Sequence, residues 1–287
     1  MIFSLIAATR NRPIELKRFL DSLQGQAPAR FEVIVVDQSS QAEFDTNKSI
    51  LTPDRHSFPI MHIRSEAIGL SRARNLGMQH ATGQIYAFPD DDCWYREGYL
   101  NDIESWFTSH PQYTFLSGQY SEPNIVNPHS LMGHRPLASA ASAFHVRSVS
   151  LFVQASLITK KHLCFDESIG AGTALPAGEE NEFVIRIIRS GGSGYYSSDF
   201  ITYHAIFRDQ ANDDDSLNRS EEAYGYVLGK HITCPTIIAR AMIGYGRSLI
   251  EAFGRNSKVN RWRARSRGIV KGLRTARNSH RAEKAAE

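Results

Sequence analysis

Three consecutive carboxylates form the group in this sequence that is most able to do chemistry. They are Asp90, Asp91 and Asp92, in the stretch YAFPDDDCWY at residues 86–95. Adjacent carboxylates repel one another, so they are tolerated where a bound cation or a solvated loop absorbs their charge. Mg²⁺ and Mn²⁺ bind one or two protein carboxylates and complete their coordination with phosphate and water. Because an apolar run precedes the three residues and aromatic residues flank them, we expect a cation site rather than a plain turn.

A second aspartate triplet, NDDDS at residues 212–216, provides an internal comparison. It follows no apolar run and lies among Gln, Asn, Ser and Arg, a composition that is typical of a solvated loop. We therefore expect no cation site there, and we expect the polar segment 211–220 to be a loop.

A second carboxylate cluster, GEENE at residues 178–182, follows a loop rich in Gly and Ala. It opens a predicted helix with an apolar face of Phe183, Val184, Ile187 and Ile188. The positive end of a helix dipole stabilises a carboxylate, which would stay ionised and ready to accept a proton. The alternative is that acidic residues in a first helical turn only compensate the dipole.

Strand and helix patterns alternate through the first hundred residues. Short apolar runs predict buried strands at 2–8, 31–37, 60–64 and 84–88. Helical periodicity predicts helices at 11–25 and at 70–83, the second capped by Ser71 and ended by Gly83. The segment 38–59 is expected to be a loop. This series predicts an α/β fold with a mostly parallel central sheet flanked by helices. Ligands of such sheets bind beyond the carboxyl ends of the strands. Because residues 9–12, 37–39 and 90–92 each follow a strand, we expect three polar clusters on one rim.

The alternation weakens after residue 100. A helix is predicted at 99–107, strands at 113–120, 150–158 and 200–207, a long loop at 123–143, and helical, increasingly basic sequence after residue 220. The 287 residues are 41% hydrophobic, enough for one sizeable core. Three widely spaced cysteines indicate reduced thiols, and no apolar run reaches 18 residues. With no secretory signal visible, these features predict a cytoplasmic protein that is soluble or peripheral to a membrane.

The net charge of +3 hides an asymmetry along the chain. Residues 255–287 contain 11 Lys and Arg but 2 Asp and Glu, whereas residues 1–254 contain 22 basic and 28 acidic residues. Three interpretations of this basic segment stay open: a solvated tail, a helix lying on anionic lipid, or nucleic-acid binding. The amphipathic segment 235–253 favours an anionic membrane surface, and we expect no nucleic-acid partner.

Three sequence blocks, in this order and spacing, resemble the family 2 glycosyltransferases, which have the GT-A fold. The blocks are FEVIVVDQSS, GLSRARNLGMQHATGQIYAFPDDDCWY and GAGTALPAGEENEFVIR, and the resemblance covers residues 1–210. It implies a nucleotide-diphosphate sugar as donor and Mn²⁺ or Mg²⁺ held by an Asp-x-Asp element. It also implies a carboxylate base and inversion of the anomeric centre.

The resemblance implies donor-site roles for four residues that follow the first strands. Thr9 and Arg10 would line the nucleotide pocket, Asp37 would hydrogen-bond the nucleobase, and Arg74 would contact the base or the diphosphate. Gln38 stands where the family often has a second Asp, which leaves the preferred base open. The alternatives are that Asp37 caps the next segment and that Arg74 lies on the surface.

The resemblance also assigns the metal and the ribose to the aspartate triplet. Asp90 would face the ribose and the metal, Asp92 would bind the metal, and Asp91 would lie beside them on the donor side. The assignment of these roles among the three residues stays open by one position. His204 matches a histidine that approaches the metal or the diphosphate in relatives, and its alternative role is structural.

The acidic pair that opens the later helix holds the catalytic base in the family. Glu180 occupies the second position of this pair and is the expected base, although the family more often has Asp there. Glu179 would orient the acceptor or the loop, and which of the two is the base stays open. The stretch Gly170–Gly178 would be an acceptor loop that orders on binding.

These observations predict a metal-dependent inverting glycosyltransferase acting in bacterial-type polysaccharide or glycoconjugate synthesis. We expect a GT-A domain at 1–210, with a nucleotide-sugar half at 1–95 and an acceptor half at 96–210, and a helical basic extension at 211–287. The acceptor would be a saccharide or a lipid-linked saccharide, reached from the cytoplasmic face of a membrane. Two alternatives are a nucleotidyltransferase with the same metal site and a non-catalytic nucleotide- or carbohydrate-binding module.

Overall fold

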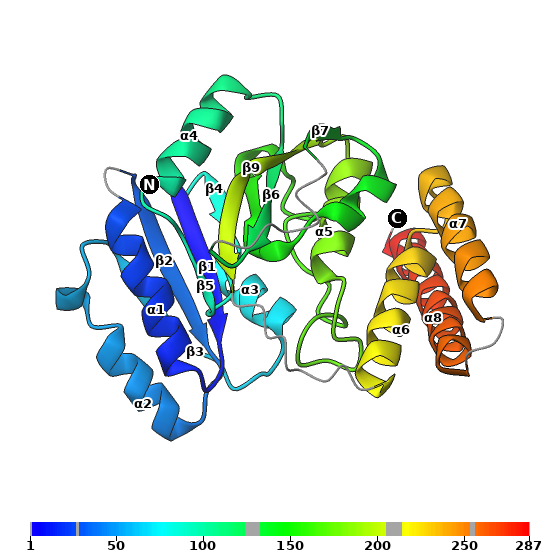
Figure 1. The fold of residues 1–287 in the computed structure, drawn as a ribbon, viewed down its shortest axis with the longest axis horizontal. Helices are drawn as coiled ribbons and strands as arrows, with labels where there is room; N and C mark the ends of the chain where they lie inside the picture. The colour runs from blue at the N-terminus through cyan, green and yellow to red at the C-terminus, as the bar shows by residue number, and fades with distance from the viewer. Residues whose placement is uncertain (1, 27–28, 124–132, 205–213, 253–255, 287) are drawn as a thin grey trace.

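The computed structural model describes residues 2–26, 29–123, 133–204, 214–252 and 256–286 (Figure 1). Its centre is a nine-stranded sheet in the order β3-β2-β1-β4-β8-β6-β9-β5, with β7 beside β9. The strands are β1 Phe3–Thr9, β2 Phe31–Asp37, β3 Ile60–Arg64, β4 Ile85–Ala87, β5 Cys93–Trp94, β6 Phe115–Ser121, β7 His134–Leu137, β8 Leu151–Gln154 and β9 Gly194–His204. The helices are α1 Pro13–Leu23, α2 Gln41–Ile50, α3 Leu70–Met78, α4 Tyr99–Ser109, α5 Glu179–Arg189, α6 Asp214–Lys230, α7 Pro235–Ala252 and α8 Asn256–Ala286.

The sheet is parallel where the first strands meet and mixed farther along the chain. β1 lies between β2 and β4, and β2 pairs with β3, all in parallel. β8 runs antiparallel to both β4 and β6, and β9 is parallel to β6 but antiparallel to β5 and β7. The carboxyl ends of the parallel strands therefore face the β4–β5 turn, and β9 brings His204 to the same region.

Two apolar clusters fill the space between the sheet and its helices. Alternate strand residues such as Ile6 and Ile34 pack in the cluster that contains the apolar face of α5. Their neighbours Leu5 and Val33 pack in the cluster that contains residues of α1 and α4. Both faces of β1 and β2 are thus covered, which explains why these strands are nearly continuous apolar runs.

Several predicted boundaries were wrong. The segment 41–50 is helix α2 rather than a loop. It was not predicted because Asn47 is its one buried residue, so its sequence shows no apolar periodicity. Helix α3 follows Gly69 and ends at Met78, and the Ser71 hydroxyl donates to the carbonyl of Ile169 at 2.6 Å instead of capping the helix. Strand β9 begins before the predicted residue 200.

Two segments expected to be loops contain regular structure. Between residues 123 and 143 lie β7 and the start of a 3₁₀ helix, Ala140–His145, while residues 124–132 fall outside the described part. In the second aspartate triplet, Asp214 and Asp215 form the first turn of α6, where the helix dipole favours acidic residues. Asn212 and Asp213, the other polar residues of that motif, lie outside the described residues.

Glycines let the backbones of α6 and α8 approach closely; the two helices lie with α7 at the right of Figure 1. A Cβ atom at Gly229 would lie 2.2 Å from the carbonyl oxygen of Ile269, and one at Gly272 would lie 2.1 Å from that of Tyr226. Gly225 and Gly268 make equally close approaches across the same interface. Larger side chains at these positions would force the helices apart.

A buried charge network anchors α6 to α5. Lys230 Nζ lies 2.7 Å from Asp166 Oδ2 and 2.8 Å from Glu182 Oε1, and His231 Nε2 lies 3.3 Å from the same Glu182 oxygen. Burial alone would raise the pKa of Glu182, but His231, Arg186 and Lys230 hold it well below its usual range. The C-terminal helices are therefore attached to the helix that begins with the Glu179–Glu180 pair. Among the described residues, no helix combines the length and the apolar character that a membrane crossing requires.

Candidate active site

Arg12 lies over the turn that carries the aspartate triplet. Its Nη1 donates to Asp91 Oδ1 at 2.8 Å and its Nη2 donates to Asp92 Oδ2 at 2.9 Å. The Thr9 hydroxyl donates to Asp91 Oδ2 at 2.8 Å, which places Thr9 at the predicted site, whereas the side chain of Arg10 is exposed. Burial raises the pKa of Asp91 to about 6, although Arg12 and Thr9 act in the opposite direction. The sequence analysis placed Arg12 on this rim with residues 9–12 but gave it no role of its own.

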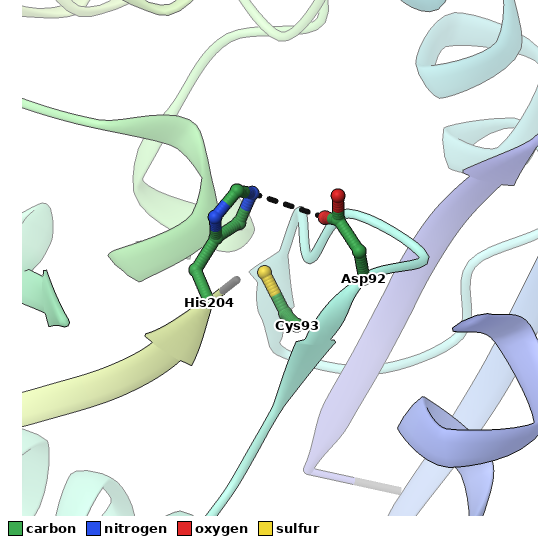
Figure 2. A group of neighbouring side chains, drawn as sticks. All are labelled: Asp92, Cys93 and His204. Carbon is green, nitrogen blue, oxygen red and sulfur yellow. Dashed lines mark ion pairs between the residues drawn. The ribbon is translucent and has the colours of Figure 1, made fainter. Parts of the chain in front are cut away.

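Asp92, Cys93 and His204 converge on one point, as Figure 2 shows. Cys93 is paired directly with His204 in the β5–β9 ladder, so their side chains lie on the same face. Asp92 Oδ1 lies 3.0 Å from His204 Nε2, and the three possible ligand atoms all lie within 4.8 Å of one another. Burial would raise the pKa of Asp92, but His204 and Arg12 lower it, so the carboxylate is ionised at neutral pH.

The donor set fits a divalent cation held by oxygen and nitrogen. A carboxylate and an imidazole are both ligands that suit Mn²⁺. The Cys93 thiol is a soft donor, and burial together with the neighbouring aspartates raises its pKa well above the ordinary value. Asp92 and His204 are therefore the residues that would hold Mn²⁺ or Mg²⁺, with Cys93 as a neutral neighbour.

Arg74 connects the two carboxylate clusters. Its Nη2 donates to Asp90 Oδ1 at 3.0 Å and its Nη1 donates to Glu179 Oε1 at 3.1 Å. The guanidinium is fully buried and lies over the ring of Phe165, 5.3 Å from its centroid. The alternative of a surface arginine is thus wrong, and the aspartate turn and the start of α5 form one continuous site.

Glu180 faces a cavity of about 290 Å³ whose lining also includes Asp90, His204, Tyr120 and Arg147. Burial, and then the adjacent Glu179 carboxylate, raise the pKa of Glu180 to about 7. The expectation that the helix N-terminus would keep this group firmly ionised was wrong, because desolvation and like charge outweigh the dipole. A carboxylate that titrates near neutrality is well matched to proton transfer.

Asp37 lies buried at the end of β2, and protein groups contact both of its oxygens. Oδ1 accepts a hydrogen bond from the Ser39 amide at 2.9 Å, while Oδ2 lies 2.9 Å from Asn47 Nδ2 and 3.0 Å from His62 Nε2. Burial would raise the pKa of Asp37, but these hydrogen bonds lower it. Its contact with a nucleobase stays a prediction. Nothing in the sequence singled out His62, which here contacts the Asp37 carboxylate.

Comparison with known proteins relates this chain to one family. The model for glycosyl transferase family 2 matches residues 4–141. An uncharacterized glycosyltransferase of Haemophilus influenzae is 22% identical over 234 residues, 80% of this chain and 77% of that protein. Glycosyltransferase GlyA of Streptococcus pneumoniae is 33% identical over 89 residues, 31% of this chain and 12% of that protein.

Solved structures share the fold at low sequence identity. The S. aureus TarS 1–349 structure has a TM-score of 0.60 at 18% identity, covering 99% of this chain and 92% of that one. Mannosyltransferase PcManGT from Pyrobaculum calidifontis, in complex with GDP-Man and Mn²⁺, has a TM-score of 0.64 at 16% identity, covering 94% and 86%.

The sheet, its rim of carboxylates and these structural likenesses define a GT-A fold. Together with the family match, they place residues 4–141 in glycosyltransferase family 2 and show that the chain is a glycosyltransferase. The alternatives of a nucleotidyltransferase and of a non-catalytic module are therefore set aside. The matched range includes Thr9, Asp37 and the aspartate triplet, whereas the Glu179–Glu180 pair lies beyond it.

Proposed function

We propose that this enzyme transfers a sugar from a nucleotide-diphosphate sugar to an acceptor hydroxyl, with inversion and with the aid of a divalent cation. One observation carries the proposal: Asp90 and His204, from the donor side, line the same cavity as Glu180. An aspartate-bound donor and a base facing a common space are what an attack by an activated hydroxyl requires.

The donor half of the proposal assigns Asp92 and His204 to Mn²⁺ or Mg²⁺, and Thr9, Arg10, Asp37, Asp90 and Asp91 to the nucleotide sugar. A bound divalent cation supplies charge compensation for the leaving diphosphate. Arg12 is a further candidate for the diphosphate, since its guanidinium already spans two carboxylates of the turn. Related structures support a nucleotide-sugar donor, because TarS was solved with UDP and with UDP-GlcNAc and PcManGT with GDP-Man.

The acceptor half assigns the base to Glu180. Its carboxylate would remove the proton from the acceptor hydroxyl, which then attacks the anomeric carbon opposite the leaving group. Glu179 is held by Arg74 at 3.1 Å, so it is a positioning residue rather than a second base. The loop Gly170–Gly178, closed by a hydrogen bond from the Gly170 amide to the Leu175 carbonyl, borders the cavity through Pro176 and Ala177 and is assigned to the acceptor.

The two halves of the site also suggest how the chain is divided. We assign residues 1–210 to the GT-A domain, with the donor half at 1–95 and the acceptor half at 96–210, and residues 211–287 to a helical extension. A saccharide or lipid-linked saccharide acceptor, used in polysaccharide or glycoconjugate synthesis, would place the enzyme at the cytoplasmic face of a membrane.

Calorimetry with UDP, GDP and dTDP tests the donor assignment, with and without Mn²⁺, on the wild type and on Asp92→Asn. We expect one nucleotide to bind in a Mn²⁺-dependent manner that Asp92→Asn abolishes. Glu180→Gln is the matched variant: it should keep that binding but lower kcat by about 10²–10⁴-fold. Equal binding without Mn²⁺ would refute the metal assignment, and full activity of Glu180→Gln would refute the base.

A further inference from the structure

Five arginines form a straight stripe along the outer side of α8. They are Arg263, Arg267, Arg274, Arg277 and Arg281, and all five side chains are exposed. Together with Val270, which is 47% exposed, they follow one another at intervals of four and three residues. At 100° and 1.5 Å per residue, this spacing confines the six side chains to an arc of about 80° over a length of about 27 Å. We call these five residues the arginine stripe.

The opposite side of α8 packs against the protein. Gly268 and Gly272 lie against the backbone of α6, and Ala264 is buried. These three positions are about 100–180° around the helix from Arg263. The arginine stripe therefore faces away from α6, and the packing that fixes α8 also fixes the direction of the stripe.

Most of the arginine stripe has no countercharge within the described part of the chain. Arg267 Nη2 lies 3.1 Å from Glu222, an acidic residue of α6. Across the described residues, the ion pairs include none made by the other four arginines. Aligned cations without acidic neighbours repel one another, so they favour an anionic surface that meets them all at once.

We propose that the arginine stripe docks on the anionic surface of a lipid bilayer. The inference rests on the proposed function for its rationale, a lipid-linked acceptor, but its residues are separate from the proposed active site. A single flat row of cations matches a planar array of headgroups, each arginine near it adding to the attraction. Such a contact would place the enzyme on the membrane without any helix entering the hydrocarbon.

Exposed apolar side chains favour lipid over a nucleic acid as the occupant. Val270 interrupts the stripe at its middle, and the neighbouring helix α7 exposes Ile238, Met242 and Ile243 at 41%, 70% and 61%. Apolar groups of this kind gain free energy at a membrane interface but find no match on a phosphate backbone. Residues 1–254 also contain more acidic than basic residues, which opposes a polyanion that wraps around the protein.

Vesicle co-sedimentation of the full chain tests the proposal. The vesicles are phosphatidylcholine alone or with one third phosphatidylglycerol, at low salt (about 0.05 M) and high salt (about 0.5 M). One variant changes Arg263, Arg274, Arg277 and Arg281 to Gln, and a second changes them to Lys. The control variant changes four exposed cations elsewhere, Arg30, Lys48, Arg55 and Lys160, to Gln and so removes the same charge.

We expect salt-sensitive binding to the anionic vesicles that the Gln variant weakens by several hundred-fold, since each arginine contributes about fivefold. The Lys variant and the control variant should bind within about tenfold of the wild type. Binding that falls equally in the control variant, or no binding by the wild type, would overturn the inference. Tighter binding to a duplex oligonucleotide through the same arginines would overturn it in favour of nucleic acid. The Gln variant should keep Mn²⁺-dependent nucleotide binding in solution, so failure here and failure of the proposed function can be told apart.

Discussion

The bridge made by Arg74 offers a direct test of how the active site is held together. We consider Arg74→Met, which replaces the guanidinium with an apolar chain under the ring of Phe165. The change leaves Glu179, whose side chain is 7% exposed, without its cation, while Asp90, at 31% exposed, regains water. Breaking a buried ion pair costs about 3–5 kcal/mol, and rehydration of Asp90 favours the lower end. We therefore expect the free energy of unfolding to fall by about 3 kcal/mol.

The same helix supplies a matched control. Arg72 pairs with Glu167 at 3.2 Å, but the two side chains are 53% and 47% exposed, so Arg72→Met should cost at most about 1 kcal/mol. Urea denaturation measures both variants. Adding Glu179→Gln to Arg74→Met removes the uncompensated charge and should recover part of the loss. Equal costs for Arg74→Met and Arg72→Met, together with an additive double variant, would refute the buried bridge.

Three further outcomes follow from the same structure. Because the proposed base must be ionised and the pKa of Glu180 is raised to about 7, kcat should rise with pH through that region, and Glu179→Gln should move the midpoint of the pH–rate profile downward. Gly229→Ala should lower the free energy of unfolding by about 1–3 kcal/mol, because its Cβ would collide with the backbone of α8. In the same urea titration, Gly244→Ala should be neutral or stabilising, because its Cβ would meet a flexible arginine side chain. Because the Cys93 thiol stays protonated, the absorption spectrum of the protein with Co²⁺ in place of Mn²⁺ should show no sulfur-to-cobalt charge-transfer band. For the same reason, Cys93→Ser should leave the Mn²⁺ affinity within about twofold of the wild type.

The sequence was most informative where an apolar run ends in a polar cluster. The strand at 31–37 was predicted at the bounds that the structure shows, and so was the strand at 60–64. Parallel strands bring their carboxyl ends together, so Thr9 and the aspartate turn could be placed on one rim from the chain order alone. Thr9 does contact Asp91 directly. Local periodicity was enough to predict these features, because it marks where each strand ends and so which polar residues follow it.

Features that depend on contacts between distant segments could not be predicted in this way. No local pattern marks Arg12 as a partner of Asp91 and Asp92, since α1 and the aspartate turn meet through the packing of the sheet. Helix α2 was missed because it is polar on almost every side, so no apolar periodicity indicates a helix there. The burial of Arg74 could not be predicted either, because an arginine on a helix is usually exposed. Here Asp90 and Glu179, which are distant in sequence from one another, supply the two carboxylates that pair with it.

The clearest failure of local reasoning explains how the site could work. A carboxylate in the first turn of a helix should be strongly ionised, yet the pKa of Glu180 is raised to about 7. Two cations of the site are engaged by other carboxylates, Arg74 by Asp90 and Glu179, and Arg12 by the other two aspartates, while Arg147 in the cavity wall only partly offsets the rise in the pKa of Glu180. Within the described chain, no ion pair of 4.0 Å or less is formed by Glu180, and the neighbouring charge with the largest effect on its pKa is that of Glu179. A carboxylate so placed keeps a proton affinity high enough to take a hydroxyl proton and still loses it near neutral pH. Burial and the adjacent Glu179 carboxylate, rather than the helix that carries Glu180, therefore set its fitness as a base.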